Sequence, residues 1–194
     1  MSNSLIWAEP AHAIVYAENH DTYCPDKISE PEITRRGIIR QKELAYAFVL
    51  FSPGLPSVYW LDYYDTPYHD GRTTGITNGY FGAPLKPTID RLIWIRTNFL
   101  AESISCISTN PTTKADLFIA KRGGAGNKPG AILVLNDHET LSYSNWVWTG
   151  WTNAILRDWC PTSSYATVQT DTNGLAWLGA TSRSFRIYAP TNWP

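Results

Sequence analysis

Two apolar runs that end abruptly in polar residues mark the first hundred positions of the chain. The run at residues 13–17 is followed at once by the polar segment 18–22, and the run at residues 57–61 by the polar segment 62–65. Short continuous apolar runs are typical of parallel strands whose two faces are covered by helices. We expect two buried strands whose carboxyl ends lie where α/β proteins place their chemistry.

The segment between these runs has helical periodicity. From about residue 32 to residue 51 apolar side chains recur near one stripe, and the breakers of Ser52-Pro53-Gly54 end the pattern. Strand, helix and strand predict a right-handed β-α-β unit with parallel strands. After the Gly- and Pro-rich segment 66–87 we expect a second helix, with Thr88 as its cap.

Past residue 101 the pattern changes to short β-forming runs bounded by Gly, Pro, Asn or Asp. The predicted strands are 104–108, 116–121, 131–136, 146–149, 154–156, 166–170, 175–178 and 184–188. Residues 123–130 read as a loose hairpin connection, and Asn173-Gly174 as a tight hairpin turn because Asn-Gly supplies the positive φ such turns need. These runs predict an antiparallel Greek-key or sandwich domain.

Composition narrows the function classes. The 194 residues are 43% hydrophobic, as in a globular protein, and their net charge of -1 does not favour nucleic acid or an anionic membrane. No span approaches the ~20 apolar residues of a membrane helix. Nine Trp and eleven Tyr are an excess that suits sugar binding as well as core packing. Cys24, Cys106 and Cys160 lack Cys-x-x-Cys spacing, so we expect buried side chains, or one bridge and a spare thiol, and no zinc or redox motif.

The tip of the first run carries a family resemblance. The segment 16–21 resembles the strand-seven motif of the alpha-amylase family of glycoside hydrolases, an aromatic or apolar pair followed by Asx-Asn-His-Asp. Asn19, His20 and Asp21 match it, whereas Ala17 and Glu18 depart from it. Segments 42–50 and 52–60 resemble the family's next helix, its Pro-Gly-x-Pro turn and its last barrel strand, in the same order.

The resemblance implies an α+β chain in two parts. Residues 1–101 would be the last β-α-β-α portion of a catalytic (β/α)8 barrel, and residues 102–194 the antiparallel Greek-key β-sandwich that follows the barrel in alpha-amylases. Two barrel strands leave open edges and uncovered apolar faces, so we expect the first part alone to be loosely packed or self-associating, and the β domain to fold by itself.

The same resemblance implies a retaining hydrolase of α-1,4-glucans. Asp21 would be the catalytic carboxylate that stabilises the cationic transition state, and His20 and Asn19 would be substrate-binding residues, with Asn19 supporting the strand end. The family's nucleophile and acid/base lie in segments absent from this sequence, and Asp21 with Asp62 is not expected to form a complete site. The chain alone is therefore predicted to be inactive.

Partners and cofactors follow from this interpretation. We expect an α-glucan or oligosaccharide as ligand and the missing N-terminal barrel portion as partner, with no nucleic acid and no membrane. The resemblance leaves calcium open for the intact parent, and Asp137-His138-Glu139 is only a weak calcium signal. The first four residues carry no export signal, although the parent is expected to be secreted.

Structural interpretations of the same residues stay open beside the catalytic interpretation. The His20-Asp21 pair could be structural, and the aromatic side chains of segment 59–64 are expected in the core rather than in a sugar cleft. Alternation puts Trp146 and Trp148 on one face, where burial between sheets is favoured over a sugar-stacking platform with Trp151. The rival functions are a non-catalytic carbohydrate-binding or structural β module, and a split enzyme that docks onto a chain with the other strands.

Overall fold

The computed structural model describes residues 4–19, 41–64, 85–101, 104–106, 115–160 and 166–192. Its helical elements are α1 (Leu5–Ala8), the 3-10 helix η1 (Pro10–His12), α2 (Lys42–Phe51), α3 (Trp60–Tyr64) and α4 (Lys86–Phe99). Its strands are β1 (Ile14–Tyr16), β2 (Leu55–Ser57), β3 (Ile104–Cys106), β4 (Leu117–Arg122), β5 (Ala131–Asn136), β6 (Tyr143–Trp148), β7 (Ile155–Asp158), β8 (Thr167–Gln169), β9 (Leu175–Ala180) and β10 (Ser184–Pro190).

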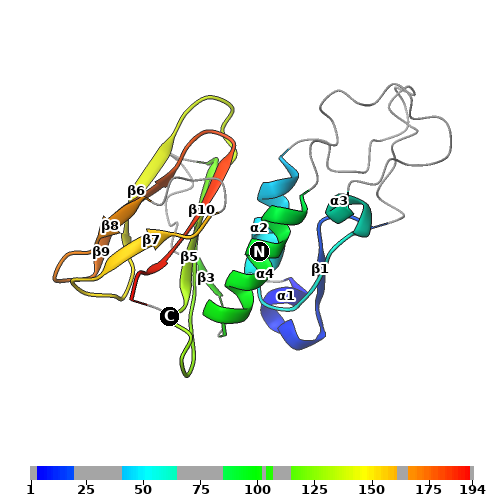
Figure 1. The fold of residues 1–194 in the computed structure, drawn as a ribbon, viewed down its shortest axis with the longest axis horizontal. Coiled ribbons are helices and arrows are strands. Elements are labelled where there is room, and N and C mark those ends of the chain that lie inside the picture. Colours follow the sequence, from blue (N-terminus) through cyan, green and yellow to red (C-terminus); the bar gives the residue numbers. More distant parts are fainter. Residues whose placement is uncertain are drawn as a thin grey trace.

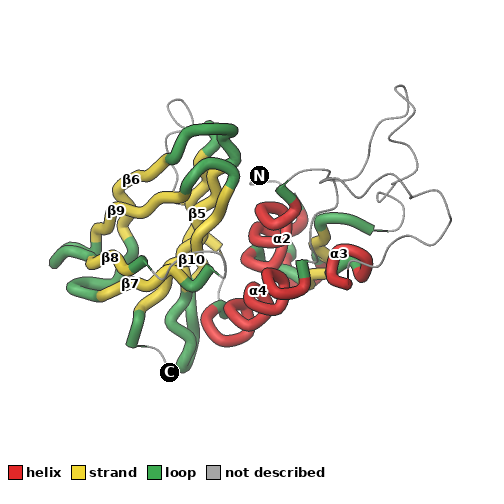
Figure 2. The backbone as a smooth tube through the Cα atoms, turned by 45° about the horizontal axis from the view of Figure 1, so that its top comes forward, coloured by secondary structure: helices red, strands yellow, loops and turns green. Residues whose placement is uncertain are grey.

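The described elements form three layers side by side. Helices α2 and α4 lie between the antiparallel strands on one side and β1 with α3 on the other (Figure 1). The view in Figure 2 shows the same order from a second direction. The chain is thus mixed α/β and mostly β-sheet, with its helices gathered in the first half of the sequence.

The predicted β-α-β unit is present. β1 pairs with β2 in parallel, with Ile14 opposite Leu55 and Tyr16 opposite Ser57, and α2 connects them. The predicted strand at residues 57–61 is wrong, however, because pairing ends at Ser57 and residues 60–64 form α3. A strand continuing through these residues would carry Asp62 away from the side chains that it contacts on α2, whereas the helical turn brings it onto them.

Two arginines hold the end of α2. Arg96 of α4 donates to the carbonyls of Leu50, Ser52 and Gly54, and Arg122 of β4 donates to those of Phe51 and Ser52. Burial, with repulsion from Arg96, lowers the pKa of Arg122 to about 10, so it stays charged at neutral pH. The last carbonyl groups of a helix have no partner within it, and at the end of α2 they accept hydrogen bonds from α4 and from the large sheet.

Helix α4 begins earlier than predicted. Thr88 lies inside it, because the helix starts at Lys86 with Pro87 in its first turn. Proline is well suited to that position, since its fixed φ is helical and its missing N–H has no partner there. The helix buries Ile89, Leu92, Ile95 and Phe99, as its apolar pattern indicates, whereas Ile93, which was also expected on the buried side, is exposed.

In the described part of the β region, strands form two sheets. The larger has the order β3-β4-β5-β10-β7-β8 and the smaller is the ribbon β6-β9, all pairs being antiparallel. Apolar residues including Ile119, Ile132 and Leu178 pack between the sheets. The tight turn at residues 171–174 is present, with Gly174 at φ 80°, but its flanking strands β8 and β9 join different sheets and do not pair.

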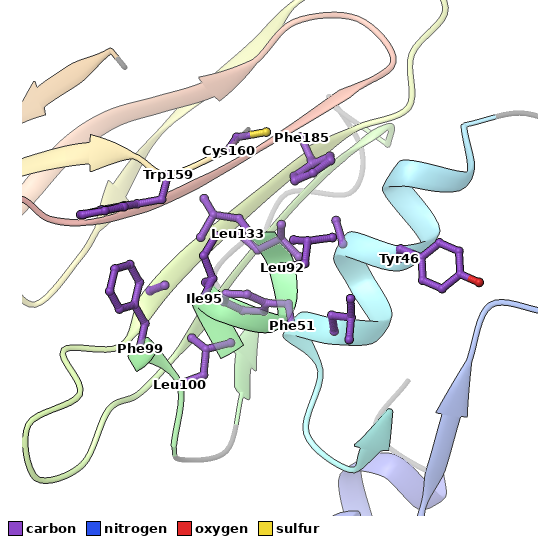
Figure 3. Packing of buried hydrophobic residues seen from close by; sticks show 14 of the residues in the cluster. Tyr46, Phe51, Leu92, Ile95, Phe99, Leu100, Leu133, Trp159, Cys160 and Phe185 are labelled. Atoms are coloured by element: carbon purple, nitrogen blue, oxygen red, sulfur yellow. The ribbon is translucent and has the colours of Figure 1, made fainter. Parts of the chain in front are cut away.

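One hydrophobic core crosses the predicted domain boundary. Tyr46 and Phe51 of α2, with Ile95 of α4, share a cluster with Leu133 of β5 and Phe185 of β10 (Figure 3). The helices thus cover the face of the large sheet opposite the ribbon. The domain boundary at residue 101 stays a prediction. Apolar side chains from both sides of it pack together, which the sequence patterns did not indicate.

Cys160 is buried in the same cluster, as predicted for a structural side chain; Cys24 lies outside the described residues.

Candidate functional site

The predicted site residues follow β1 in the sequence. The strand ends at Tyr16, and the described chain continues through buried Glu18 to half-buried Asn19. His20 and Asp21 lie outside the described residues. The parallel pairing with β2 places residues 17–19 beside the chain that leaves β2 and enters α3, at the same edge of the pair.

A buried charge cluster occupies this edge. The ammonium of Lys42, the first residue of α2, donates to Glu18 Oε2 at 2.6 Å and to Asp62 Oδ1 at 2.5 Å. All three side chains are almost fully removed from solvent. The cluster therefore links the segment after β1 to the start of α2 and to α3, and it fixes the backbone directly before the predicted site residues.

Tyr46 completes the cluster from the next turn of α2. Its hydroxyl donates to Asp62 Oδ2 at 2.6 Å and accepts from the backbone N–H of Tyr59 at 3.3 Å. Burial and the hydrogen bond to the Asp62 carboxylate hold the pKa of the Tyr46 hydroxyl well above its ordinary value. The hydroxyl is thus a permanent donor, and it orients the Asp62 carboxylate between itself and Lys42.

The two carboxylates of the cluster do not form a glycosidase pair. Their oxygens share one ammonium and so lie within about 5 Å of each other, the spacing that a retaining enzyme uses. Lys42 stands between them, however, and both side chains are buried beneath the strand ends. A sugar cannot reach either oxygen without displacing the lysine, so Glu18 and Asp62 act as supports for the strand tip.

Sequence patterns missed this cluster. Lys42 and Tyr46 are four residues apart and therefore share one face of α2, the face that also buries Leu50. The signal was a lysine on the otherwise apolar stripe of a helix, since such a side chain is rarely buried without an acidic partner. Glu18, which departs from the family motif, is one of its two acidic partners.

Aromatic side chains near the strand ends are more exposed than expected. Trp60 and Tyr64 of α3 are largely solvent-accessible, so the prediction of core packing is wrong for them. Tyr63 is partly covered, because Lys86 lies over its ring and its hydroxyl donates to Asp90. The short helix buries Asp62 and leaves the rings of Trp60 and Tyr64 on its outer surface.

The parallel pair presents a bare apolar face. Ile14 is 67% exposed and Leu55 57% exposed, although they lie directly opposite each other on β1 and β2. Tyr16 on the same face is also exposed. Strands of a parallel sheet are ordinarily buried on both faces, so this face has the composition of an interior surface, and no element among the described residues covers it.

The described ranges contain neither a cluster of metal-ligating side chains nor a helix that could span a membrane. Within them, His, Cys, Asp and Glu side chains nowhere gather in a group that could hold a metal ion. Asp137, His138 and Glu139 do not converge, because the imidazole of His138 accepts from the backbone of Leu141 and Glu139 pairs with Arg183. In the part of the chain that the structure describes, no helix is long and apolar enough to cross a membrane.

Comparison with curated proteins identifies relatives of one kind. No family model matches the chain. It is 27% identical over 176 residues to the cytoplasmic alpha-amylase of Escherichia coli K12, covering 90% of this chain and 33% of that protein. It is 42% identical over 67 residues to the glucan 1,4-alpha-maltotetraohydrolase of Stutzerimonas stutzeri, covering 33% of this chain and 11% of that protein.

Solved structures give the same result for the fold. An Anoxybacillus alpha-amylase matches with a TM-score of 0.62 at 15% identity, over 92% of this chain and 38% of that one. The alpha-amylase of Geobacillus thermoleovorans, solved with acarbose, matches with a TM-score of 0.51 at 16% identity, over 91% and 38% of the two chains.

The relatives and structural neighbours of this chain are alpha-amylase family members, and it matches their C-terminal portion, which confirms the resemblance found in the sequence. The chain spans about a third of the length of the E. coli relative.

Proposed function

We propose that the chain is the C-terminal part of an alpha-amylase-type glycoside hydrolase that cleaves α-1,4-glucans with retention. The described β1-α2-β2 unit and α4 would be the end of a (β/α)8 barrel, and the antiparallel strands its Greek-key domain. The observation that carries the proposal is the parallel strand pair whose carboxyl end holds the Glu18-Lys42-Asp62 cluster directly before Asn19. Active sites of (β/α)8 barrels lie at that end of the strands.

Residues 19–21, which we call the strand tip, each have a role in this proposal. Asp21 stabilises the positive charge that develops on the sugar, because an anion fixed in a dry cleft acts strongly on such a charge. His20 and Asn19 bind the substrate, with Asn19 also supporting the strand end. Glu18 is a positioning residue, since its bond to Lys42 anchors the backbone that leads into these three.

The nucleophile and the acid/base belong, in this proposal, to a part of the barrel that the chain does not contain. A retaining mechanism needs two carboxyl groups on either side of the scissile bond. Glu18 and Asp62 cannot take those roles, because Lys42 occupies the space between them. The exposed apolar face around Ile14 and Leu55 supports a partner barrel portion, since a closed barrel would bury it.

Hydrolysis of maltoheptaose tests the proposal. The purified chain should release no product, and coexpression with the coding sequence immediately upstream should produce a complex that releases maltooligosaccharides with retained anomeric configuration. Glycogen and cellohexaose serve as an α-linked and a β-linked comparison. Efficient hydrolysis by the chain alone would contradict its incompleteness, and inversion of configuration by the complex would contradict the mechanism.

A further inference from the structure

Three tryptophans form an exposed surface on the ribbon β6-β9, far in sequence from the strand tip. Trp146 is 63%, Trp148 61% and Trp177 47% exposed, and Trp146 lies directly opposite Trp177 in the register of the two strands. Burial of Trp146 and Trp148 between the sheets was predicted, and that prediction is wrong. The opposite face of the ribbon supplies the buried residues instead, including Val147, so the tryptophans point away from the core.

The outward face of the ribbon carries no charge. Alternation places six residues on it in three cross-strand pairs, which are Ser144 with Gly179, Trp146 with Trp177, and Trp148 with Leu175. Lys121 lies beside Trp148, with its ammonium 5.5 Å from the ring centroid, and donates to the carbonyl of Thr149. Three of the six outward residues are therefore tryptophans, and the cations Lys121 and Arg186 lie beside them.

A small open pocket adjoins Trp177. It has a volume of about 240 Å³ and is lined by Trp177, Ser144, Arg186 and Tyr188, among others. Ordinary ligand sites are larger, at about 300–1,000 Å³. A single sugar ring with its hydroxyl groups suits a pocket of this size, because the guanidinium of Arg186 carries several N–H donors and lies in the same lining as the apolar ring of Trp177.

We propose that Trp146, Trp148 and Trp177 form a binding surface for an α-linked glucan chain, separate from the hydrolytic site. Pyranose rings have apolar faces that stack on aromatic side chains. The rings of Trp146 and Trp177 lie 5.4 Å apart and are inclined by 63°. Two rings at that angle cannot both stack on one flat ribbon, which is the shape of a β-1,4 glucan. A chain that turns between successive sugars, as α-1,4 linkage makes it, presents a face to each ring.

Titration calorimetry and affinity electrophoresis of the whole chain test the surface. Maltoheptaose and amylose are the probes, cellohexaose is the β-linked comparison, and the variants are Trp146→Ala, Trp177→Ala and Trp146→Phe. Ile155→Ala is the matched control, because Ile155 is a half-exposed apolar residue on another strand of the β region. We expect the chain to bind maltoheptaose, each alanine variant to bind on the order of tenfold more weakly, Trp146→Phe to lose less, and Ile155→Ala to bind normally.

Three results would contradict the proposal that this surface binds a glucan. They are no binding by the unaltered chain, binding that survives both alanine substitutions, and self-association that the substitutions abolish without any glucan binding. Preference for cellohexaose would overturn the α-linkage. Protection of tryptophans from N-bromosuccinimide by maltoheptaose gives a second readout on the unaltered protein and does not depend on folding of the variants. The choice of an α-glucan rests on the proposed function, but the substitutions lie on the ribbon and hydrolysis is measured separately on the coexpressed complex, so failure of the surface is distinguishable from failure of the hydrolytic proposal.

Discussion

Lys42 and Asp62 lie 20 residues apart in the sequence and meet in a buried ion pair, with Nζ 2.5 Å from Oδ1. Glu18 accepts from the same ammonium, so the end of β1, the start of α2 and α3 meet at one point. Desolvated charges are stabilised only by their partners, and removal of one partner leaves the others buried and uncompensated. The ammonium is therefore the element that holds the strand tip in place.

Substitution Lys42→Met should destabilise the chain strongly. It leaves the carboxylates of Glu18 and Asp62 buried side by side, and breaking a buried ion pair in this way costs about 3–5 kcal/mol. Urea unfolding monitored by circular dichroism measures the change in free energy. The triple variant Lys42→Met with Glu18→Gln and Asp62→Asn should recover part of the loss, because no uncompensated charge remains.

Lys86→Met is the matched control for that substitution. Lys86 and Asp90 form an ion pair of similar length, 2.6 Å, but both side chains are about half exposed. Exposed pairs contribute little because water and salt screen them. The unfolding midpoint of Lys86→Met should stay close to that of the unaltered chain, and equal effects of the two substitutions would contradict a special role for the buried cluster.

The free energy of unfolding should depend on Tyr46 at high pH. Burial and the bond to Asp62 raise the pKa of Tyr46 in the folded state, whereas in the unfolded chain tyrosine ionises near about 10. Above that pH the unfolded state releases the proton and the folded state keeps it, so this contribution to stability falls as pH rises. The stability difference between the unaltered chain and Tyr46→Phe should therefore shrink from pH 9 to pH 11. A constant difference would contradict the assignment.

Substitution of Gly54, which directly precedes β2, should destabilise the chain more than substitution of Gly126. The φ of Gly54 is 100°, and an added Cβ would lie 2.8 Å from the carbonyl oxygen of Ala13 and 3.0 Å from Val15 Cγ2. Gly54→Ala should cost at least ~2 kcal/mol from strain and contact with β1. Gly126 is the control, because it also has positive φ but open space around its Cβ position, and Gly126→Ala should cost only about 1–2 kcal/mol. Thermal unfolding of both variants measures the difference, and equal melting temperatures would contradict a close approach of the two strands.

The bare face of the parallel pair should make the chain associate. Ile14→Ser with Leu55→Ser removes apolar surface from β1 and β2, so sedimentation should show less self-association of this variant. Ile155→Ser removes a comparable exposed side chain from β7 and should change association little. A monomeric unaltered chain, or association that the double variant leaves unchanged, would contradict the proposal that this face is completed by a partner barrel portion.

Local patterns predicted the elements better than their partners. The apolar run at residues 131–136 and the apolar stripe that contains α2 were found because burial imposes their periodicity directly. The turn before Gly174 was found from its Asn-Gly pair, but the turn does not determine which sheet the next strand joins. That choice depends on packing across the two sheets, which no local pattern contains.

The candidate site was likewise predicted only where a local motif marked it. Asn19, His20 and Asp21 were predicted from a motif, whereas Lys42 and Tyr46 became visible only through contacts over 20 and 16 residues of sequence. The exposure of Trp146 was mispredicted because alternation assigns a residue to a face but does not say which face the core covers. Long-range contacts, rather than residue types, decide both cases.

The catalytic constant of Asp21→Asn, in the chain coexpressed with the proposed partner barrel portion, is the most direct measure of the proposed site. Asp137→Asn, at an exposed position after β5, is the matched control. We expect Asp21→Asn to lower kcat on maltoheptaose at least ~10²-fold, because a fixed charge facing the transition state is lost, while the control keeps full activity. A kcat for Asp21→Asn within twofold of the unaltered complex would contradict the assignment of the strand tip as part of a glucan-cleaving centre.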